Sequence, residues 1–129
     1  MPIEYSWLVE GRVVAMKSSG VLTAEDLISE ESVMANYLAH ATAPLLHIVA
    51  DQTGLEKFPD LKLMSSSKWP KDPRVGWFVM YGLNNKILSF VASIGAQLFR
   101  MRIRMVSTRA DALAFLQKVD STLPNLNES

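Results

Sequence analysis

Residues 75–106, VGWFVMYGLNNKILSFVASIGAQLFRMRIRMV, decide the fold, because their periodicity changes from strand to helix and back. Val75 to Tyr81 is rich in β-branched and aromatic residues, which is typical of a buried strand. The segment 85–99 is apolar over several helical turns, and Met101 to Val106 then alternates strictly between apolar and basic residues. The stretch therefore predicts strand, helix and strand, the unit that builds a parallel sheet.

The same pattern continues toward the N-terminus. Two short apolar runs, Ile3 to Val9 and Arg12 to Ser18, are joined by a Glu-Gly pair and predict a β-hairpin. The segment from Thr23 to His40 opens with a Thr-x-x-Asp capping pattern and continues with a helical stripe, which predicts a helix. Leu45 to Ala50 predicts a strand buried on both faces, and Asp51 to Gly54 predicts the turn that ends it.

The remaining segments complete one α/β domain over residues 1–129. Asp60 to Lys68 predicts a weaker helix, and the two prolines of 69–73 predict a stiff connector without helix. Thr108 caps a final helix at Ala112 to Val119, and a polar tail follows over 120–129, beyond a core of about 3–119. The predicted order is β-β-α-β-α-β-α-β-α, a mostly parallel sheet with an opening antiparallel hairpin.

Composition excludes several classes of function. The chain has 129 residues, 49% of them hydrophobic and 20% charged, which is typical of a globular domain. Lys+Arg 13 balances Asp+Glu 13, so no overall field favours nucleic acid. The absence of cysteine excludes disulfides and thiolate metal sites. No signal-peptide pattern or membrane span is apparent, so we expect a cytoplasmic protein without a cofactor.

Three further strings carry information about the family: GVLTAEDL at 20–27, WPKDPRVG at 69–76 and DALAFL at 111–116. Together with the element order, they resemble the SpoIIAA-like branch of the sulfate-transporter and anti-sigma-factor-antagonist (STAS) family. The strings look like that branch's entry into its first helix, its approach to a central strand and its closing helix. The similarity spans about residues 3–119.

The resemblance implies a non-enzymatic module that binds partner proteins, nucleotides or apolar ligands. Many members are switched by phosphorylation of a Ser or Thr in an Asp-Ser-x-Gly turn. The string Asp51 to Gly54 departs from this motif, because its hydroxyl does not directly follow the aspartate, and Asp60 is followed by Leu61. We therefore expect Thr53 to be a turn residue bonded to local backbone, not a phosphoacceptor.

The two histidines have ordinary structural interpretations. His40 lies near the C-terminus of a predicted helix, where positive charge suits the helix dipole. His47 shares a strand face with Leu45 and Val49, so we expect a hydrogen-bonded core or interface residue. Neither histidine has the spacing of a metal ligand, and we expect no metal site and no catalytic residue.

The C-terminal ends of the parallel strands predict a ligand-binding rim, because ligands of such sheets bind there. Helices that begin near Asn84 and Thr108 would direct free backbone N–H groups to the rim, where an anionic head group could bind. Arg109 would supply a countercharge for an amphipathic acid. Alternatively, Asn84 and Thr108 only cap their helices. The candidate rim residues are Asp51, Thr53, Tyr81, Asn84, Asn85, Thr108 and Arg109.

The predicted helix 85–99 is apolar around most of its circumference, and Ile87, Val91, Ile94 and Leu98 form a stripe that the sheet can bury. A helix of this kind needs cover on a second side and is too short to cross a bilayer. The options are a homodimer interface, which we favour because small residues permit close approach, the wall of an apolar pocket, a membrane-surface contact, or burial within the monomer. The candidate interface residues are Leu88, Phe90, Val91, Ile94 and Phe99.

Arg100, Arg102 and Arg104 follow this helix at a spacing of two. Arginines in such an array can bind phosphates or acidic partners. They can equally form the solvent face of an edge strand, where charge discourages aggregation, and we favour this second interpretation.

The sequence as a whole predicts a STAS-like binding module that is not an enzyme. We expect it to act through protein–protein contacts as a homodimer. The alternative is a carrier or sensor of a small amphipathic ligand, held between the helix 85–99 and the strand-end rim. An enzyme comes third, because an α/β scaffold can support catalysis but no assembled catalytic group is visible here.

Overall fold

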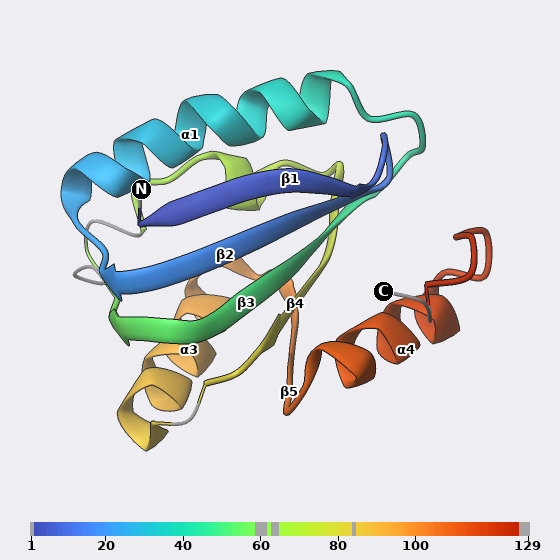
Figure 1. Ribbon diagram of the computed structural model, residues 1–129. Helices are drawn as coiled ribbons and strands as arrows, with labels where there is room; N and C mark the ends of the chain where they lie inside the picture. The colour runs from blue at the N-terminus through green and yellow to red at the C-terminus, as the bar shows by residue number, and fades with distance from the viewer. Residues whose placement is uncertain (1, 59–61, 63–64, 84, 127–129) are drawn as a thin grey trace.

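The computed structural model describes residues 2–58, 62, 65–83 and 85–126, except for the side chains of residues 96, 98 and 99. It confirms the predicted alternation of strands and helices (Figure 1). The elements in chain order are β1 (Ile3–Val9), β2 (Val13–Val21), α1 (Ala24–Ala39), β3 (Leu46–Lys57), the 3₁₀ helix η1 (Trp69–Lys71), β4 (Val75–Tyr81), α3 (Lys86–Phe99), β5 (Arg102–Val106) and α4 (Arg109–Val119).

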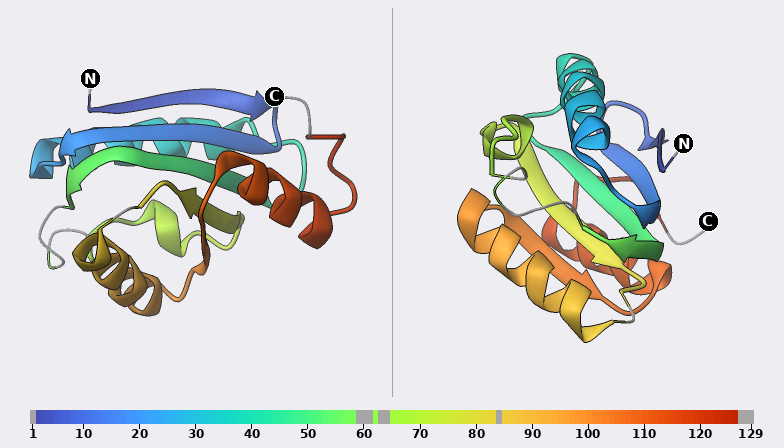
Figure 2. Two further views of the ribbon diagram at one scale, coloured as in Figure 1. Left: turned by 60° about the horizontal axis from the view of Figure 1, so that its bottom comes forward. Right: turned by 90° about the vertical axis from the view of Figure 1, so that its left-hand side faces the viewer.

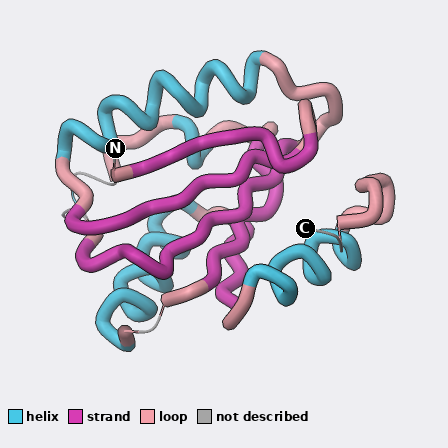
Figure 3. The backbone as a smooth tube through the Cα atoms, in the orientation of Figure 1, coloured by secondary structure: helices cyan, strands magenta, loops and turns pink. Residues whose placement is uncertain are grey.

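The five strands form one sheet in the order β1-β2-β3-β4-β5 (Figure 3). β1 and β2 pair antiparallel, and the other neighbouring strands pair parallel, as the sequence predicts. The hairpin turn contains Gly11 with a φ of 75°, a conformation that glycine adopts without strain.

Helices cover both faces of the sheet (Figure 2). The connections β2-α1-β3, β3-η1-β4 and β4-α3-β5 each move one strand further in the same direction. Because such crossovers are right-handed, α1, η1 and α3 all lie on one face. α4 packs on the opposite face, where its Ala112, Leu113 and Leu116 meet valines of β2, β3 and β4. None of the described helices has the length and hydropathy that a bilayer crossing requires.

Two apolar cores follow from this arrangement. The larger core joins α1 and α3 to the sheet through residues such as Met34, Ile48 and Leu88. The smaller core lies under α4 and includes Val49 and Val79. Alternation along β3 supplies both cores, because Ile48 and Val49 point to opposite faces.

The predicted helix caps are confirmed. The Thr23 side chain accepts a hydrogen bond from the Asp26 N–H, and the Asp26 carboxylate accepts one from the Thr23 N–H, a complete capping box. The Thr108 hydroxyl accepts from the Asp111 N–H at 3.1 Å. His40 is the C-cap of α1, as expected from its position, and its Nδ1 lies 2.8 Å from a carbonyl oxygen of the preceding turn.

The turn predicted at Asp51–Gly54 is wrong, because β3 continues through it to Lys57. Parallel pairing holds the segment extended, with Gly54 opposite Ser19 of β2. Asp51 still bonds locally, since its carboxylate accepts from the N–H and the hydroxyl of Thr53. The local turn signal is real, but pairing with the neighbouring strand overrides it.

Two connecting segments also differ from expectation. Within the predicted helix 60–68, residues 60, 61, 63 and 64 lie outside the described part of the chain. Residues 65–68 form a turn and a bend, so the helix does not extend to Lys68 as predicted. The connector at 69–73 begins with η1, which has Pro70 in its first turn. A proline in that position loses no hydrogen bond, so two prolines exclude an α-helix but not a short 3₁₀ turn.

The segment after α4 extends the core beyond the predicted boundary at residue 119. Leu123 and Leu126 are buried against the α4 core. The Gln117 side-chain amide donates to the carbonyl oxygens of Leu123 and Pro124, and its oxygen accepts from the Leu126 N–H. Residues 120–126 are therefore a packed part of the domain and not a polar tail.

β5 is an edge strand, and its arginines lie mostly in solvent. Arg102 donates to the Val75 carbonyl oxygen at 3.2 Å, and the Arg104 guanidinium lies 5.2 Å from the centre of the Phe115 ring. Both arginines thus have local partners, which agrees with the edge-strand interpretation.

Candidate ligand-binding pocket

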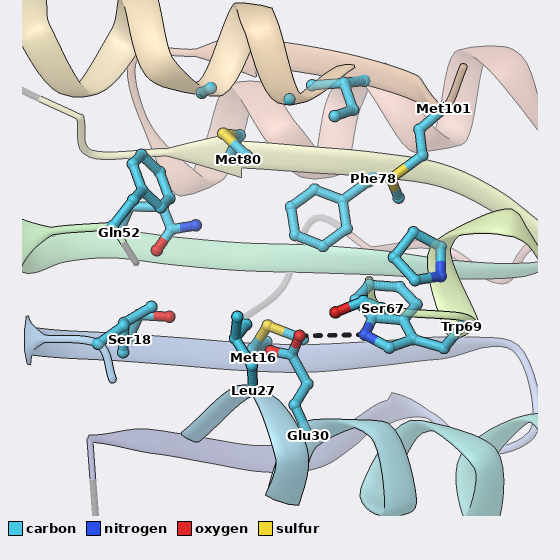
Figure 4. Close-up of a pocket in the computed structure, with 16 residues that line it drawn as sticks. Met16, Ser18, Leu27, Glu30, Gln52, Ser67, Trp69, Phe78, Met80 and Met101 are labelled. Atoms are coloured by element: carbon cyan, nitrogen blue, oxygen red, sulfur yellow. Dashed lines mark hydrogen bonds between the residues drawn. The ribbon is translucent and has the colours of Figure 1, made fainter. Parts of the chain in front are cut away.

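A cavity of about 100 Å³, partly open to solvent, lies between the sheet and the helices α1 and α3 (Figure 4). We call it the α1–α3 pocket. Its walls are mainly apolar and include Leu27, Phe78, Met80, Ala92, Met101 and Ile103. Four buried polar side chains also line it: Ser18, Glu30, Gln52 and Ser67. Apolar walls with a few convergent polar groups are typical of small-molecule sites.

Strand alternation places the polar residues of the sheet in this pocket. Gln52 lies two residues after Ala50 on β3, and Ser18 lies two residues after Met16 on β2. Residues two apart share one face of a sheet, so these polar side chains continue an otherwise apolar face. Figure 4 shows Gln52 and Ser18 on one side of the pocket.

Glu30 reaches the pocket from α1, where it belongs to the buried face together with Met34 and Leu38. A charged residue on the buried stripe of a helix is rare unless it has a partner. Sequence reasoning did not identify Glu30. The signal was its position in register with Leu27, Met34 and Leu38, at the spacing that otherwise carries core residues.

Two adjacent glutamates hold Trp69 in place. The indole Nε1–H of Trp69 donates to Glu30 Oε1 at 3.0 Å. The carboxylate of Glu31 accepts from the backbone N–H groups of Lys68 and Trp69 at 2.7 and 2.9 Å. α1 thereby fixes both the backbone and the ring of η1, and the Trp69 ring becomes a rigid wall of the pocket.

Burial changes the ionisation of Glu30. It raises the pKa of Glu30 to about 7, and the negative charges of Glu31 and Asp26 act in the same direction. Hydrogen bonds from Trp69 and Tyr5 to the carboxylate lower that pKa but do not reverse the increase. Burial and the charge of Glu30 likewise raise the pKa of Tyr5 above its ordinary value. Near neutral pH Glu30 is therefore a mixture of acid and carboxylate.

Gln52 carries the second unusual group of the pocket. Its Oε1 is buried and has no hydrogen-bond partner among the described residues. Buried polar atoms in folded proteins are nearly always paired, so each exception needs an explanation. Sequence reasoning placed Gln52 in a turn and missed it, because the strand that buries it was expected to end at Ala50.

The structure brings together three of the predicted rim residues. Asp51, Tyr81 and Arg109 line one cleft with Lys17 on the α4 face of the sheet. Thr53 bonds to Asp51 through its hydroxyl at 2.6 Å. These residues lie on the face opposite the α1–α3 pocket, because side chains adjacent to Gln52 on β3 point the other way.

The other rim residues serve local structure. Thr108 caps α4, which confirms the capping interpretation, and the Asn85 side chain accepts from the Ile87 N–H at 2.8 Å. Asn84 lies outside the described residues. Asp51, Tyr81 and Arg109 of the rim lie on the opposite face of the sheet from the α1–α3 pocket, so they do not line it together with α3. Arg109 in particular cannot serve as a countercharge in the α1–α3 pocket, since the sheet separates them.

The face of α3 that packs on the sheet differs from the stripe predicted to be buried there. Ile87 is 72% exposed, whereas Leu88 is only 5% exposed and packs in the larger core together with Ala92. Leu88 is therefore wrong as an interface residue. Phe90 is 66% exposed and available for contact. Of the other interface candidates, Val91 and Ile94 are half-buried, and the side chain of Phe99 lies outside the description.

His47 is a core residue with both ring nitrogens bonded, as predicted, and is 1% exposed. Its Nδ1 accepts from the Trp77 N–H at 3.0 Å, so the proton resides on Nε2, which donates to Asp120 at 2.9 Å. Hydrogen bonds from Thr122 and His47 lower the pKa of Asp120 to about 2. Within the described part of the chain, no group of three His, Asp or Glu residues is arranged to hold a metal ion.

The mostly parallel sheet, its opening hairpin and its helical layers define an α/β domain with a SpoIIAA-like fold. The crystal structure of an uncharacterized protein from the DUF3478 family with a SpoIIAA-like fold, from Shewanella loihica PV-4, matches it with a TM-score of 0.63. The match covers 88% of this chain and 93% of that one at 19% identity, which shows a shared fold. No model of a protein family and no curated protein matches the chain.

Proposed function

We propose that this protein is a non-enzymatic binding module that holds a small amphipathic molecule in the α1–α3 pocket. The observation that carries the proposal is the buried Gln52 Oε1, an acceptor in an apolar cavity that has no partner within the described part of the chain. Leaving such a group unpaired costs about 1–3 kcal/mol, and a ligand that donates a hydrogen bond would recover that loss.

The size of the cavity limits the ligand. A dry cavity of about 150 Å³ can hold benzene. The α1–α3 pocket, at about 100 Å³, is slightly smaller and partly open. We therefore infer a ligand no larger than a short-chain amphiphile, or a longer one whose far end extends into solvent.

Binding is favoured over catalysis by the chemistry of the lining. Glu30 is the one ionisable residue among the described residues of the pocket. One oxygen of its carboxylate already accepts the Trp69 indole N–H. A general acid or base acts on a group held by further catalytic residues, and the described lining offers no charged partner for that role.

A cavity-filling substitution tests the proposal. Ala92 lies in the pocket wall, so Ala92→Leu should fill the cavity. Native mass spectrometry of gently purified wild-type protein should detect a bound small molecule that Ala92→Leu lacks. Ala114→Leu, at an exposed position of α4, is the matched control and should keep the ligand. The proposal fails if wild-type protein carries no ligand and no short-chain amphiphile binds it.

The second candidate function is contact with another copy of this chain through the outer face of α3. Ile87 and Phe90 are large apolar side chains exposed on that face. Sedimentation should then show a homodimer, and Phe90→Glu should give a folded monomer. Ile28→Glu, an equally exposed apolar position on α1, should leave the dimer intact. A wild-type protein that is monomeric at high concentration excludes this function.

A further inference from the structure

We propose that the α1–α3 pocket selects a ligand whose head group donates hydrogen bonds, an alcohol or amine, and rejects carboxylates and phosphates. The inference rests on the proposed function and names the chemical class of its ligand. It differs from the sequence-based expectation of an amphipathic acid, because that expectation depended on Arg109, which lies on the other face of the sheet.

Two buried acceptors in the pocket, Gln52 Oε1 and the Glu30 carboxylate, can receive hydrogen bonds from a ligand. Gln52 Oε1 has two lone pairs, and none of the residues that the structure describes bonds to it. The Glu30 carboxylate accepts one hydrogen bond from Trp69 Nε1 and, when ionised, has further acceptor capacity. A hydroxyl or an amine can donate to either group. A carboxylate cannot donate, so it would leave Gln52 Oε1 unpaired.

Charge reinforces this selection. The described lining residues include no lysine, arginine or histidine, so an anionic head group would have no countercharge in the pocket. It would instead enter beside Glu30, with Asp26 and Glu31 also close enough to act on that carboxyl. Burying an anion without a partner, next to like charge, is strongly unfavourable.

A matched ligand series tests the proposal with the intact protein: 1-hexanol, hexylamine and hexanoate share one chain and differ in the head group. The Trp69 indole N–H bonds directly to Glu30, so its amide-region NMR signal reports on the pocket. At pH 8, 1-hexanol and hexylamine should shift this signal saturably. Hexanoate should bind at least about tenfold more weakly.

Gln52→Leu identifies the acceptor. Loss of one neutral hydrogen bond should weaken 1-hexanol about fivefold. The variant should also fold at least as stably as wild type, because it removes an unpaired buried group. Thr53→Val, which changes the adjacent side chain on the other face, should not affect binding.

The outcomes separate the two proposals. If hexanoate binds as tightly as 1-hexanol, or if Gln52→Leu has no effect on 1-hexanol, the preference for donors is overturned while the pocket remains a binding site. If none of the three compounds binds saturably, both the ligand class and the proposed binding function are overturned.

Discussion

Replacing Glu30 by glutamine should raise the free energy of unfolding by about 3 kcal/mol at pH 8 and change it little below pH 4.5. Burial raises the pKa of Glu30 in the folded protein to about 7, whereas its ordinary value is 4.5. Each pKa unit corresponds to about 1.36 kcal/mol, so the difference between the two values gives about 3 kcal/mol. Glutamine resembles the protonated acid and can still accept from Trp69.

The sign follows from proton binding. Below pH 4.5 the carboxyl is protonated in the folded and the unfolded chain, so it does not oppose folding. Between pH 4.5 and 7 the unfolded chain releases the proton while the folded protein retains it, and the free energy of unfolding of wild type falls as pH rises. Above pH 7 both states are ionised and the loss is complete. Tyr5, Asp26 and Glu31 are the ionisable groups that act on this carboxyl.

Urea denaturation at several pH values between 4.5 and 8 measures the effect. The difference between Glu30→Gln and wild type is taken at each pH, so that contributions from other carboxyls, such as Asp72 and Asp120 with their lowered pKa values, cancel. Glu25→Gln, at an exposed position in the first turn of α1, should change stability by less than about 1 kcal/mol. Parallel stability curves for Glu30→Gln and wild type across this range would refute the reasoning.

Three further substitutions and one control test local structure elsewhere in the domain, each by chemical denaturation. Asp120→Ala leaves the buried Nε2–H of His47 without its acceptor and should cost about 2 kcal/mol, and an unchanged stability would argue against this bond. Thr108→Ala removes the N-cap of α4 and should lower the free energy of unfolding by about 1 kcal/mol. The loss of structure should be limited to α4 and should not extend to the sheet. Gly76→Ala would place a Cβ against the His47 ring and should lower the free energy of unfolding by about 3 kcal/mol. The control Gly20→Ala adds a Cβ in open space at a φ of 68° and should lower it by about 1 kcal/mol. Equal losses would contradict the crowding at Gly76.

Most of the fold could be predicted from the sequence because local signals and tertiary structure agree. The strict alternation after Met101, the capping pattern at Thr23 and the buried run from Val75 each correspond to an observed element. The prediction failed at Asp51–Gly54, where the residues favour a turn and do form a local Asp51–Thr53 bond. Pairing with β2 decides the conformation there, and no single segment contains that information.

The candidate site was harder to predict for two physical reasons. α3 is apolar on nearly every side, so its sequence does not determine which face meets the sheet, and Leu88 was assigned to the outside. The predicted end of β3 at Ala50 also put Gln52 in a turn, so its burial on the α1–α3 face, opposite its neighbours on β3, could not be predicted. The grouping of Asp51, Tyr81 and Arg109 was correct, because it depends only on strand order and direction.

The segment 120–126 links parts of the chain that are made at very different times. Arg12 of the first hairpin bonds to Asp120 and Thr122, which lie 108 and 110 positions further along. While the chain is being synthesised, the strands of the sheet are therefore complete before residues 120–126, which complete the smaller core, have been made. A nascent chain at this stage exposes the valines of the smaller core to chaperones or to other nascent chains. Contacts this distant in sequence also slow the final step of folding, so this domain should depend on protection during synthesis more than its size alone would indicate.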